Sequence, residues 1–248
     1  MPRLKYDLHI HTPHSVCYVE NMHPELNLHT TPADIVAAAL DRGLDVLAIT
    51  DHNSGEYVEQ MREAARDTGL TILPGFEISA RAGHVLGLFE VDTPVVVLRD
   101  VLAGAGFTEI EQGNGFARTG IWIDEVFRLI AEAGGLAIAA HVDREPRGFL
   151  ASEESFAAKR RIYDSPHLGA LEITNPENRD RWGLGRDPRY PLARPCLQSS
   201  DAHAPAEIGR RPVLVEAESP TLAGLRAALA DHLNRVQFLG DADGFLEA

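Results

Sequence analysis

The chain has 248 residues, of which 44% are hydrophobic, and its formal net charge is −14 at pH 7. That length suits a single α/β barrel, since such domains commonly run to about 250 residues as one unit, and we expect one domain over residues 1–248. The lack of an apolar run of about 18 residues excludes a membrane-spanning helix, and the acidity argues against binding to long duplex nucleic acid, which usually requires a basic face.

Apolar runs of strand length recur along the whole chain and are separated by segments with helix signals. The expected strands are Lys5–Ile10, Asp45–Thr50, Thr71–Phe76, His84–Glu90, Leu136–Ala140, Gly169–Thr174, Pro195–Ser199 and Val213–Glu216. Strands that alternate with helices predict an α/β fold with a mainly parallel sheet.

The clearest helix start is Thr31, which precedes Pro32 and Asp34, a combination typical of an N-cap, a first helical position and an acidic first turn. Gly43 is expected to end this helix. The other expected helices are Glu56–Asp67, Ile123–Ala133 and a last helix that starts at Ser219-Pro220 and places Leu222, Leu225, Leu229 and Leu233 on one face. Irregular loops are expected over Phe107–Arg118 and Arg179–Arg194.

Six histidines lie at or near the ends of the apolar runs, several of them beside carboxylates. These residues are His9, His11, His52, His84, His141 and His203, with Glu77 and Asp201 in similar positions. One histidine after an apolar run is usually an ordinary strand-end residue, but burying several together without a cation would be costly. Strands that end on one rim of a barrel converge their last side chains. Mixed imidazole and carboxylate ligands suit zinc, manganese or iron, and several of each indicate more than one ion.

The chain resembles the PHP (polymerase and histidinol phosphatase) superfamily of metal-dependent phosphoesterases. The motifs that carry the resemblance are, in order, Asp7-Leu8-His9-Ile10-His11-Thr12, Ile49-Thr50-Asp51-His52-Asn53, Gly75-Phe76-Glu77, His141 and Ser200-Asp201-Ala202-His203. The resemblance implies a distorted, TIM-like (β/α)7 barrel. It also implies two or three divalent ions at the C-terminal rim of the strands.

The resemblance further implies which side chains hold each ion. His9, His11, Glu77 and Asp201 would hold a first ion; Glu77 would bridge to a second, completed by His84 and His141; His52 and His203 would hold a third. The third site normally takes one more ligand shortly after the first motif, where many relatives have aspartate or histidine. This chain departs from that pattern, and the open candidates are His14, Cys17, Glu20 and His29.

A pair of ions that share a carboxylate would lower the pKa of a bound water and polarise phosphoryl oxygens. Arginine suits the remaining oxygens, because its planar fork matches them. Arg144 is the first candidate and Arg210 the next, while Asp51 is a candidate support for a metal-bound imidazole. The expected reaction is hydrolysis of a small phosphate ester, a nucleotide or the end of a short oligonucleotide.

Two other functions remain open from the sequence. An amidohydrolase-like enzyme would cleave C–N or C–O bonds on a similar barrel, but it typically has a bridging lysine, and Lys5 and Lys159 do not end expected strands. A non-catalytic, regulatory metal-binding domain is the other alternative. Two cysteines are too few for a disulfide framework, and the start of the chain lacks the apolar segment of a signal peptide, so a cytoplasmic protein is expected.

Overall fold

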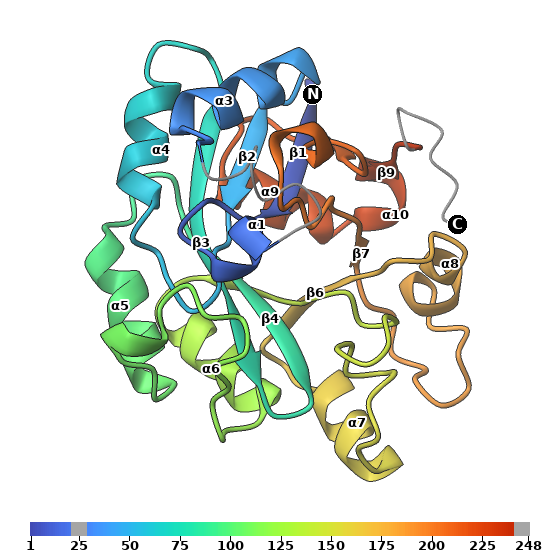
Figure 1. The fold of residues 1–248 in the computed structure, drawn as a ribbon. Helices are drawn as coiled ribbons and strands as arrows, with labels where there is room; N and C mark the ends of the chain where they lie inside the picture. Colours follow the sequence, from blue (N-terminus) through green and yellow to red (C-terminus); the bar gives the residue numbers. More distant parts are fainter. Residues whose placement is uncertain (21–28, 241–248) are drawn as a thin grey trace.

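The computed structural model describes residues 1–20 and 29–240, and within them it forms an α/β fold around one sheet (Figure 1). The strands are β1 (Arg3–Ile10), β2 (Val46–Ile49), β3 (Thr71–Ala80), β4 (Gly83–Leu88), β5 (Leu136–Ala139), β6 (Leu168–Glu172), β7 (Cys196–Leu197), β8 (Val213–Glu216) and β9 (Val236–Phe238). Eight of these coincide with expected strands to within a few residues, and β9 is an addition.

The helices lie between the strands in the sequence. They are α1 (Val16–Glu20), α3 (Pro32–Asp41), α4 (Val58–Ala65), α5 (Val95–Gly104), α6 (Ile123–Glu132), α7 (Phe156–Tyr163), α8 (Asn178–Gly183), α9 (Leu222–Leu229) and α10 (His232–Arg235), with 3-10 turns η1 (Glu109–Glu111) and η2 (Pro205–Glu207). No helix among the described residues is long and apolar enough to cross a membrane.

The helix signals in the sequence are confirmed most fully at α3. Thr31 caps its first turn and Asp34 reaches back to the Thr31 backbone, so that both halves of a capping box are present. The expected last helix is instead two short helices, because α9 ends at Leu229 and α10 begins at His232. The segment expected as a loop over Arg179–Arg194 starts inside α8, while Phe107–Arg118 is irregular apart from η1.

The sheet has nine strands in the order β7-β6-β5-β4-β3-β2-β1-β8-β9 and curves into a nearly closed barrel. The expectation of a mainly parallel sheet is wrong for half of the neighbouring pairs. β1–β2, β2–β3, β5–β6 and β6–β7 are parallel, and β3–β4, β4–β5, β1–β8 and β8–β9 are antiparallel. Only Arg81 and Ala82 separate β3 from β4, which leaves room for a hairpin but not for a crossover helix.

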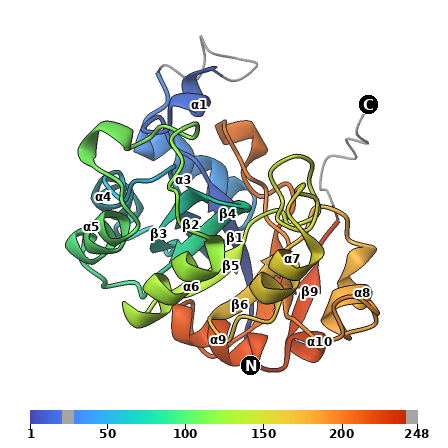
Figure 2. The same cartoon turned by 90° about the horizontal axis from the view of Figure 1, so that it is seen from below.

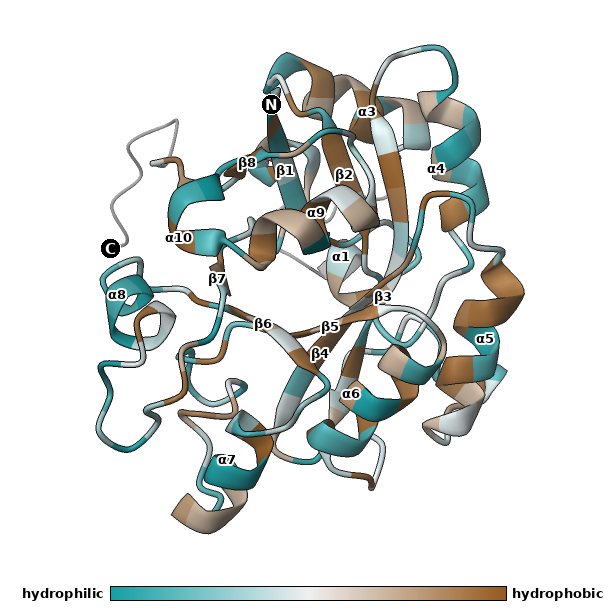
Figure 3. Ribbon diagram, turned by 180° about the vertical axis from the view of Figure 1, so that it is seen from behind, coloured by the Kyte–Doolittle hydropathy of each residue, from teal (hydrophilic) through white to brown (hydrophobic). Residues whose placement is uncertain are grey.

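Side chains of alternate residues divide between an inner and an outer apolar cluster. In β2, Val46 and Ala48 belong to the inner cluster, and Leu47 and Ile49 belong to the outer one. All nine strands contribute to the inner cluster or pack against it, and α9 closes it with Leu222, Leu225, Ala228 and Leu229. Figure 3 shows α9 lying across the strands. The outer cluster packs against α3, α4, α5 and α6, which lie around the outside of the strands in Figure 2.

A side chain joins the two ends of the sheet. Gln198 follows β7, and its side-chain amide donates to the backbone oxygens of Pro212 (3.0 Å) and Leu239 (2.7 Å), which flank β8 and β9. Gln198 is buried, so these bonds satisfy an amide that would otherwise be costly inside the protein. The barrel is therefore closed here by side-chain bonds between its edge strands.

Candidate metal centre

An irregularity in β1 directs its two histidines into the barrel. Leu8 belongs to the inner cluster, and in a regular strand the next residue would face outward. The pairing of β1 with β2 shifts register between Asp7 and Ile10, so that two residues of β1 lie opposite one of β2. Such a bulge changes the direction of the following side chains. His9 and His11 consequently face the same side as Leu8, and both are buried.

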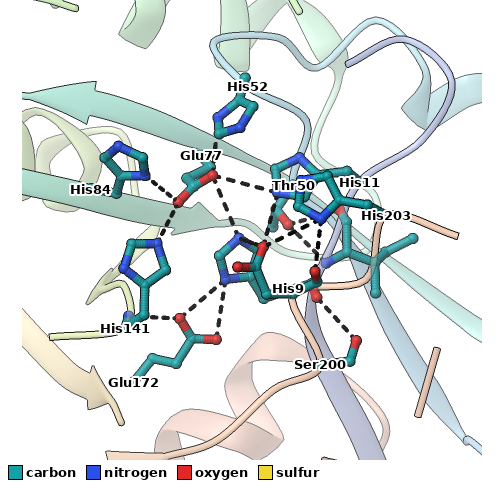
Figure 4. Close-up of polar contacts among 12 residues, drawn as sticks. His9, His11, Thr50, His52, Glu77, His84, His141, Glu172, Ser200 and His203 are labelled. Atoms are coloured by element: carbon teal, nitrogen blue, oxygen red, sulfur yellow. Dashed lines mark hydrogen bonds and ion pairs between the residues drawn. The ribbon is translucent and has the colours of Figure 1, made fainter. Parts of the chain in front are cut away.

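Glu77 lies at the centre of the site, with its two oxygens facing different histidines (Figure 4). Its Oε1 is 2.8 Å from Nδ1 of His84 and 3.1 Å from Nε2 of His141. Its Oε2 is 3.0 Å from Nδ1 of His52 and 3.5 Å from Nε2 of both His9 and His11. The carboxylate is almost wholly buried. A single carboxylate thus divides the site into two groups of imidazoles.

The β3–β4 hairpin explains how His84 reaches this point. Because β4 runs back along β3, its first residues lie beside the last residues of β3, and His84 pairs with Ser79. The Ser79 hydroxyl also lies 3.3 Å from Nε2 of His84, which turns Nδ1 of the ring toward Glu77. His84 therefore reaches the rim from the start of an antiparallel strand, whereas His11, His52 and His141 follow the ends of parallel ones.

Asp201 brings a second carboxylate to His9 and His11. Its Oδ1 is 3.2 Å from Nε2 of each ring. Asp201 and His141 both have a positive φ, at 52° and 30°, a region that residues other than glycine rarely adopt. Such conformations cost free energy and occur often at functional sites, where the surroundings impose them.

Three groups of side chains are arranged as metal ligands. They are His9, His11 and Glu77; Glu77, His84 and His141; and His11, Cys17, His52 and His203, with the ligand atoms of each group within 4.8 Å of one another. Nε2 of His9 and Nδ1 of His52 are buried and have no hydrogen-bond partner in the described part of the chain. Buried nitrogens that face carboxylate oxygens without a hydrogen bond fit divalent cations, and the donor types suit zinc, manganese or iron.

Other polar side chains hold the ligands in place. Both oxygens of Glu172 are 3.1 Å from Nδ1 of His9, and one of them accepts from the backbone N–H of His141 at 2.8 Å. Such a carboxylate fixes the orientation of a ligand imidazole. From the sequence, the place of Glu172 at the end of a strand indicates a candidate for lining the pocket, which it does, but not a support for His9. Its contact with His9 spans 163 residues, which no local pattern could indicate.

Asp51 supports the site indirectly. Its carboxylate accepts hydrogen bonds from the Thr12 N–H (2.7 Å) and from the hydroxyls of Thr12 and Ser15 (both 2.6 Å). The Ser15 hydroxyl in turn lies 3.3 Å from Nδ1 of His11. Asp51 therefore holds the loop after β1 and is linked to His11 through the Ser15 hydroxyl. It does not line the cavity beside the site.

Asp7 has the same role on the other side of the site; it begins the first sequence motif, but the motif alone predicts no role for its side chain. Its carboxylate accepts from the N–H (3.0 Å) and the hydroxyl (2.6 Å) of Ser200, and from the N–H of Gly209 (2.8 Å). These bonds fix the segment that carries Asp201 and His203.

The buried charges shift one another's protonation. Burial would raise the pKa of Glu77, but His84, His52 and His9 hold it well below its usual value. Burial lowers the pKa of His9, but Glu172, Asp201 and Glu77 outweigh it and hold the pKa well above the usual value. The pKa of His11 is well below its usual value, because burial and the neighbouring His52 and His203 disfavour a charge there. Protons on the imidazoles and cations between them are alternative ways to balance these carboxylates.

A cavity of about 360 Å³ lies against the site. It is lined by His141, Arg144, Glu172, Ile173, Thr174, Ser199, Ser200, Asp201, Arg210 and Arg211. Nη2 of Arg144 lies 2.5 Å from Oδ2 of Asp201. Arg211 donates to the backbone oxygens of Ile173 and Thr174. Arg144 and Arg210, both expected from the sequence, thus lie where an anion beside the ligands would bind.

Of the four candidates for the remaining third-site ligand, Cys17 is the one that lies in a ligand group. His14 instead bonds the hydroxyl of Ser54 at 2.8 Å, and His29 is exposed. The side chain of Glu20 lies outside the described part of the chain. Burial raises the pKa of the Cys17 thiol, but hydrogen bonds from His203 and His52 outweigh it and leave the pKa below its usual value.

Two proteins of known sequence are similar to this chain, although no protein-family model matches it. An uncharacterized protein of Methanocaldococcus jannaschii is 29% identical over 180 residues, which cover 71% of this chain and 85% of that protein. A 5'-3' exoribonuclease of Haemophilus influenzae is 31% identical over 88 residues, which cover 34% of this chain and 28% of the exoribonuclease.

Solved structures share the fold. The lesion-specific Endonuclease Q of Pyrococcus furiosus has a TM-score of 0.71 at 17% identity, over 96% of this chain and 58% of the endonuclease. A second Endonuclease Q structure has a TM-score of 0.69 at 19% identity, over 93% and 57%. This chain thus spans less than three fifths of those chains. A protein assigned as a metal-dependent phosphoesterase, from Bifidobacterium adolescentis, has a TM-score of 0.56 at 19% identity, over 91% and 95%.

The sequence predicts that so acidic a chain would not bind long duplex nucleic acid. That expectation is wrong, because a protein of the same fold binds a duplex. The second Endonuclease Q structure is a complex with a 27-mer duplex that carries an abasic lesion at the active site. Net charge sums over a whole surface, whereas binding depends on the groups that meet the ligand. Here Arg144, Arg210 and Arg211 gather at one cavity in a chain of net charge −14.

Proposed function

We propose that this protein is a metal-dependent phosphoesterase of the PHP superfamily and that residues 1–248 act as one domain. The observation that carries the proposal is the position of Glu77, whose two oxygens face separate histidine groups beside a cavity lined by arginines. Relatives of similar sequence or fold include an exoribonuclease, an endonuclease and an assigned phosphoesterase, which supports the cleavage of phosphate esters.

In this proposal the ligand groups each hold a divalent ion of manganese, zinc or iron. His9, His11, Glu77 and Asp201 hold the first; Glu77, His84 and His141 hold the second; His52 and His203 contribute to a third. When bound, such ions supply an activated water and polarise phosphoryl oxygens. Glu77 is the shared ligand, because one carboxylate has two oxygens and can span two cations.

The chain's own side chains orient and bind the substrate. Glu172 fixes the His9 ring, and Asp7 and Asp51 hold the loops that carry Asp201 and His11. Arg144 and Arg210 line the cavity, where their guanidinium groups bind the phosphoryl oxygens that face away from the ions. The substrate is a small phosphate ester, a nucleotide or the end of an oligonucleotide.

The test is hydrolysis by the purified full chain, stripped of metal and reloaded with Mn²⁺ or Zn²⁺. The substrates are p-nitrophenyl phosphate, a nucleoside monophosphate panel, and end-labelled single-stranded and duplex oligonucleotides. We expect metal-dependent release of phosphate or nucleotide from at least one of them.

A panel of amides and lactones tests the amidohydrolase alternative in parallel. Turnover of that panel alone would overturn the proposal, and so would metal binding without turnover of any ester, which would favour a regulatory domain. Both lysines lie away from the ligand groups: Lys5 donates to the backbone of Arg42 and Lys159 to that of Leu150. The bridging lysine typical of amidohydrolases is thus missing among the described residues.

A further inference from the structure

Among the described residues, Cys17 is the one that brings sulfur to a site otherwise built from nitrogen and oxygen. It lies in α1, directly after the loop that follows β1, and it is half-buried. The ligand atoms of Cys17, His52, His203 and His11 all lie within 4.8 Å of one another. The ring of His11 is close to both of the other rings, with centroid distances of 4.4 Å to His52 and 4.2 Å to His203.

Hydrogen bonds hold the two residues that precede Cys17. The Ser15 hydroxyl donates to Asp51 and accepts from the N–H of His52 at 3.1 Å. The N–H of Val16 donates to the backbone oxygen of Gly113 at 2.8 Å. Cys17 is the second residue of α1, and these bonds hold the start of that helix beside His52.

The histidines beside Cys17 have nitrogens available for an ion. Nδ1 of His203 lies 2.8 Å from the backbone oxygen of Asp201, so Nδ1 carries the proton and Nε2 is the nitrogen suited to bind an ion. His52 is 2% exposed, and its Nδ1 has no hydrogen-bond partner among the described residues. Two imidazoles and a thiolate form a ligand set of the kind that binds zinc.

We propose that Cys17, as a thiolate, ligates the third ion together with His52 and His203, and that this sulfur makes the third site selective for zinc. The two sites around Glu77 contain nitrogen and oxygen ligands alone and accept harder ions such as manganese. The inference rests on the proposed function in one respect: it concerns an ion of the same centre. It adds a ligand and a metal preference that differ between neighbouring sites.

Cobalt tests the sulfur ligand directly. Metal-free protein is titrated with Co²⁺, because a thiolate bound to Co²⁺ gives an intense near-ultraviolet charge-transfer band. We expect the band in the wild type, its loss in Cys17→Ser, and its retention in Cys196→Ala. Cys196 is a suitable control because it is buried in β7, where burial raises its pKa to about 12. A band that survives in Cys17→Ser, or a fully loaded wild type without it, would overturn the proposal.

Metal content tests the selectivity. After equilibration with equal Zn²⁺ and Mn²⁺ and removal of free ions, Cys17→Ser should hold about one zinc per chain less than the wild type. Cys17→Asp should keep the ion but exchange zinc for manganese at that site, since it replaces sulfur with oxygen. Equal zinc in all three proteins would contradict the assignment.

Alkylation of the wild type covers the case in which the variants fail to fold. Zn²⁺ should protect Cys17 from iodoacetamide at least tenfold, measured on the Cys17 peptide, and equal labelling with and without zinc would refute ligation. These readouts are independent of turnover. The cobalt band without esterase activity would refute the proposed function alone, and activity without the band would refute the role of Cys17 alone.

Discussion

Glu77 connects the two best-formed ligand groups, since each of its oxygens faces a different set of imidazoles. Glu77→Gln replaces one of these oxygens with an NH₂ group, which cannot bind a cation. We expect the variant to lose at least one ion per chain and nearly all turnover. Elemental analysis and ester hydrolysis measure this, with exposed Glu132→Gln as the control. Normal metal content and turnover in Glu77→Gln would rule out a shared carboxylate.

Arg144 tests the anion-binding role of the cavity. Its guanidinium lines the cavity and lies 2.5 Å from a carboxylate oxygen of Asp201. Arg144→Ala should lower kcat/KM by roughly 10²-fold, the scale expected for one lost charge-stabilising donor. Its metal content should stay unchanged, because His9 and His11 still face Asp201.

The control for Arg144→Ala is Arg161→Ala, which removes an exposed arginine paired with Asp124. Steady-state kinetics and elemental analysis are run on both variants. A loss of metal that parallels the loss of activity would show that Arg144 positions Asp201 instead of binding substrate. Unchanged kinetics would move the anion contact to Arg210 and Arg211.

The sequence predicts individual ligands better than their supports. The histidines and carboxylates of the motifs stand at strand ends, and a strand end is a local feature. Glu172 and Asp7 were not predicted as supports, because their contacts with His9 and Ser200 link residues 163 and 193 positions apart. The sequence alone leaves Cys17 as one of four candidates, because the position of α1 beside His52 and His203 depends on the fold.

At the scale of the elements, the loop over Phe107–Arg118 is shaped around the metal centre. The N–H of Gly113 donates to the backbone oxygen of His52 at 2.8 Å, and the Asn53 side chain donates to the backbone of Asn114 at 2.9 Å. A Cβ at Gly115 would lie 2.6 Å from Cδ2 and Nε2 of the His52 ring. Glycine at this position therefore lets the loop cover the imidazole closely.

Gly115→Ala should displace the His52 ring, because the backbone on both sides of the contact is held by hydrogen bonds. We expect loss of the third ion with less effect on the ions around Glu77. Gly120→Ala is the matched control, since a Cβ there meets nothing within 4 Å. Elemental analysis of the two variants distinguishes them, and equal metal content would show that the loop does not constrain His52.

Two features of the strands could not be predicted from the sequence patterns. The apolar run after Gly83 predicts a strand but not its direction, and the direction depends on the two-residue turn that makes β4 antiparallel. The bulge in β1 could not be predicted either, because the sequence Leu8-His9-Ile10 is compatible with a regular strand. Both features decide whether His84 and His9 face the site.

At the scale of the whole molecule, the ligands tie together segments from both ends of the chain. His9, Glu77 and His84 belong to β1, β3 and β4. The other histidines and Asp201 lie after β1, β2, β5 and β7. Because bound ions stabilise the folded state, removal by a chelator should lower Tm. The stabilisation reaches about 2.7 kcal/mol when the free ion concentration is 100 times Kd. An unchanged Tm after verified metal removal would contradict a centre built from these segments.

The stabilisation by metal should also increase with pH. In the metal-free fold, burial lowers the pKa of His52, but Glu77 and Cys17 outweigh it and raise the pKa from 6.5 to about 10. Protonated His52 therefore stabilises the metal-free fold fully below pH 6.5, and this contribution is lost as the pH rises toward about 10. A metal ion must displace the same proton, so its affinity rises over the same range.

Thermal unfolding of metal-loaded and metal-free protein between pH 6 and pH 9 measures this dependence. The difference in Tm between the two forms should widen as the pH rises, and metal binding near neutrality should release protons into a weakly buffered solution. His11 should contribute no proton, because its pKa in the metal-free fold is already well below the usual value. A Tm difference that is constant with pH, together with no proton release, would show that the histidines around Glu77 do not exchange protons for metal.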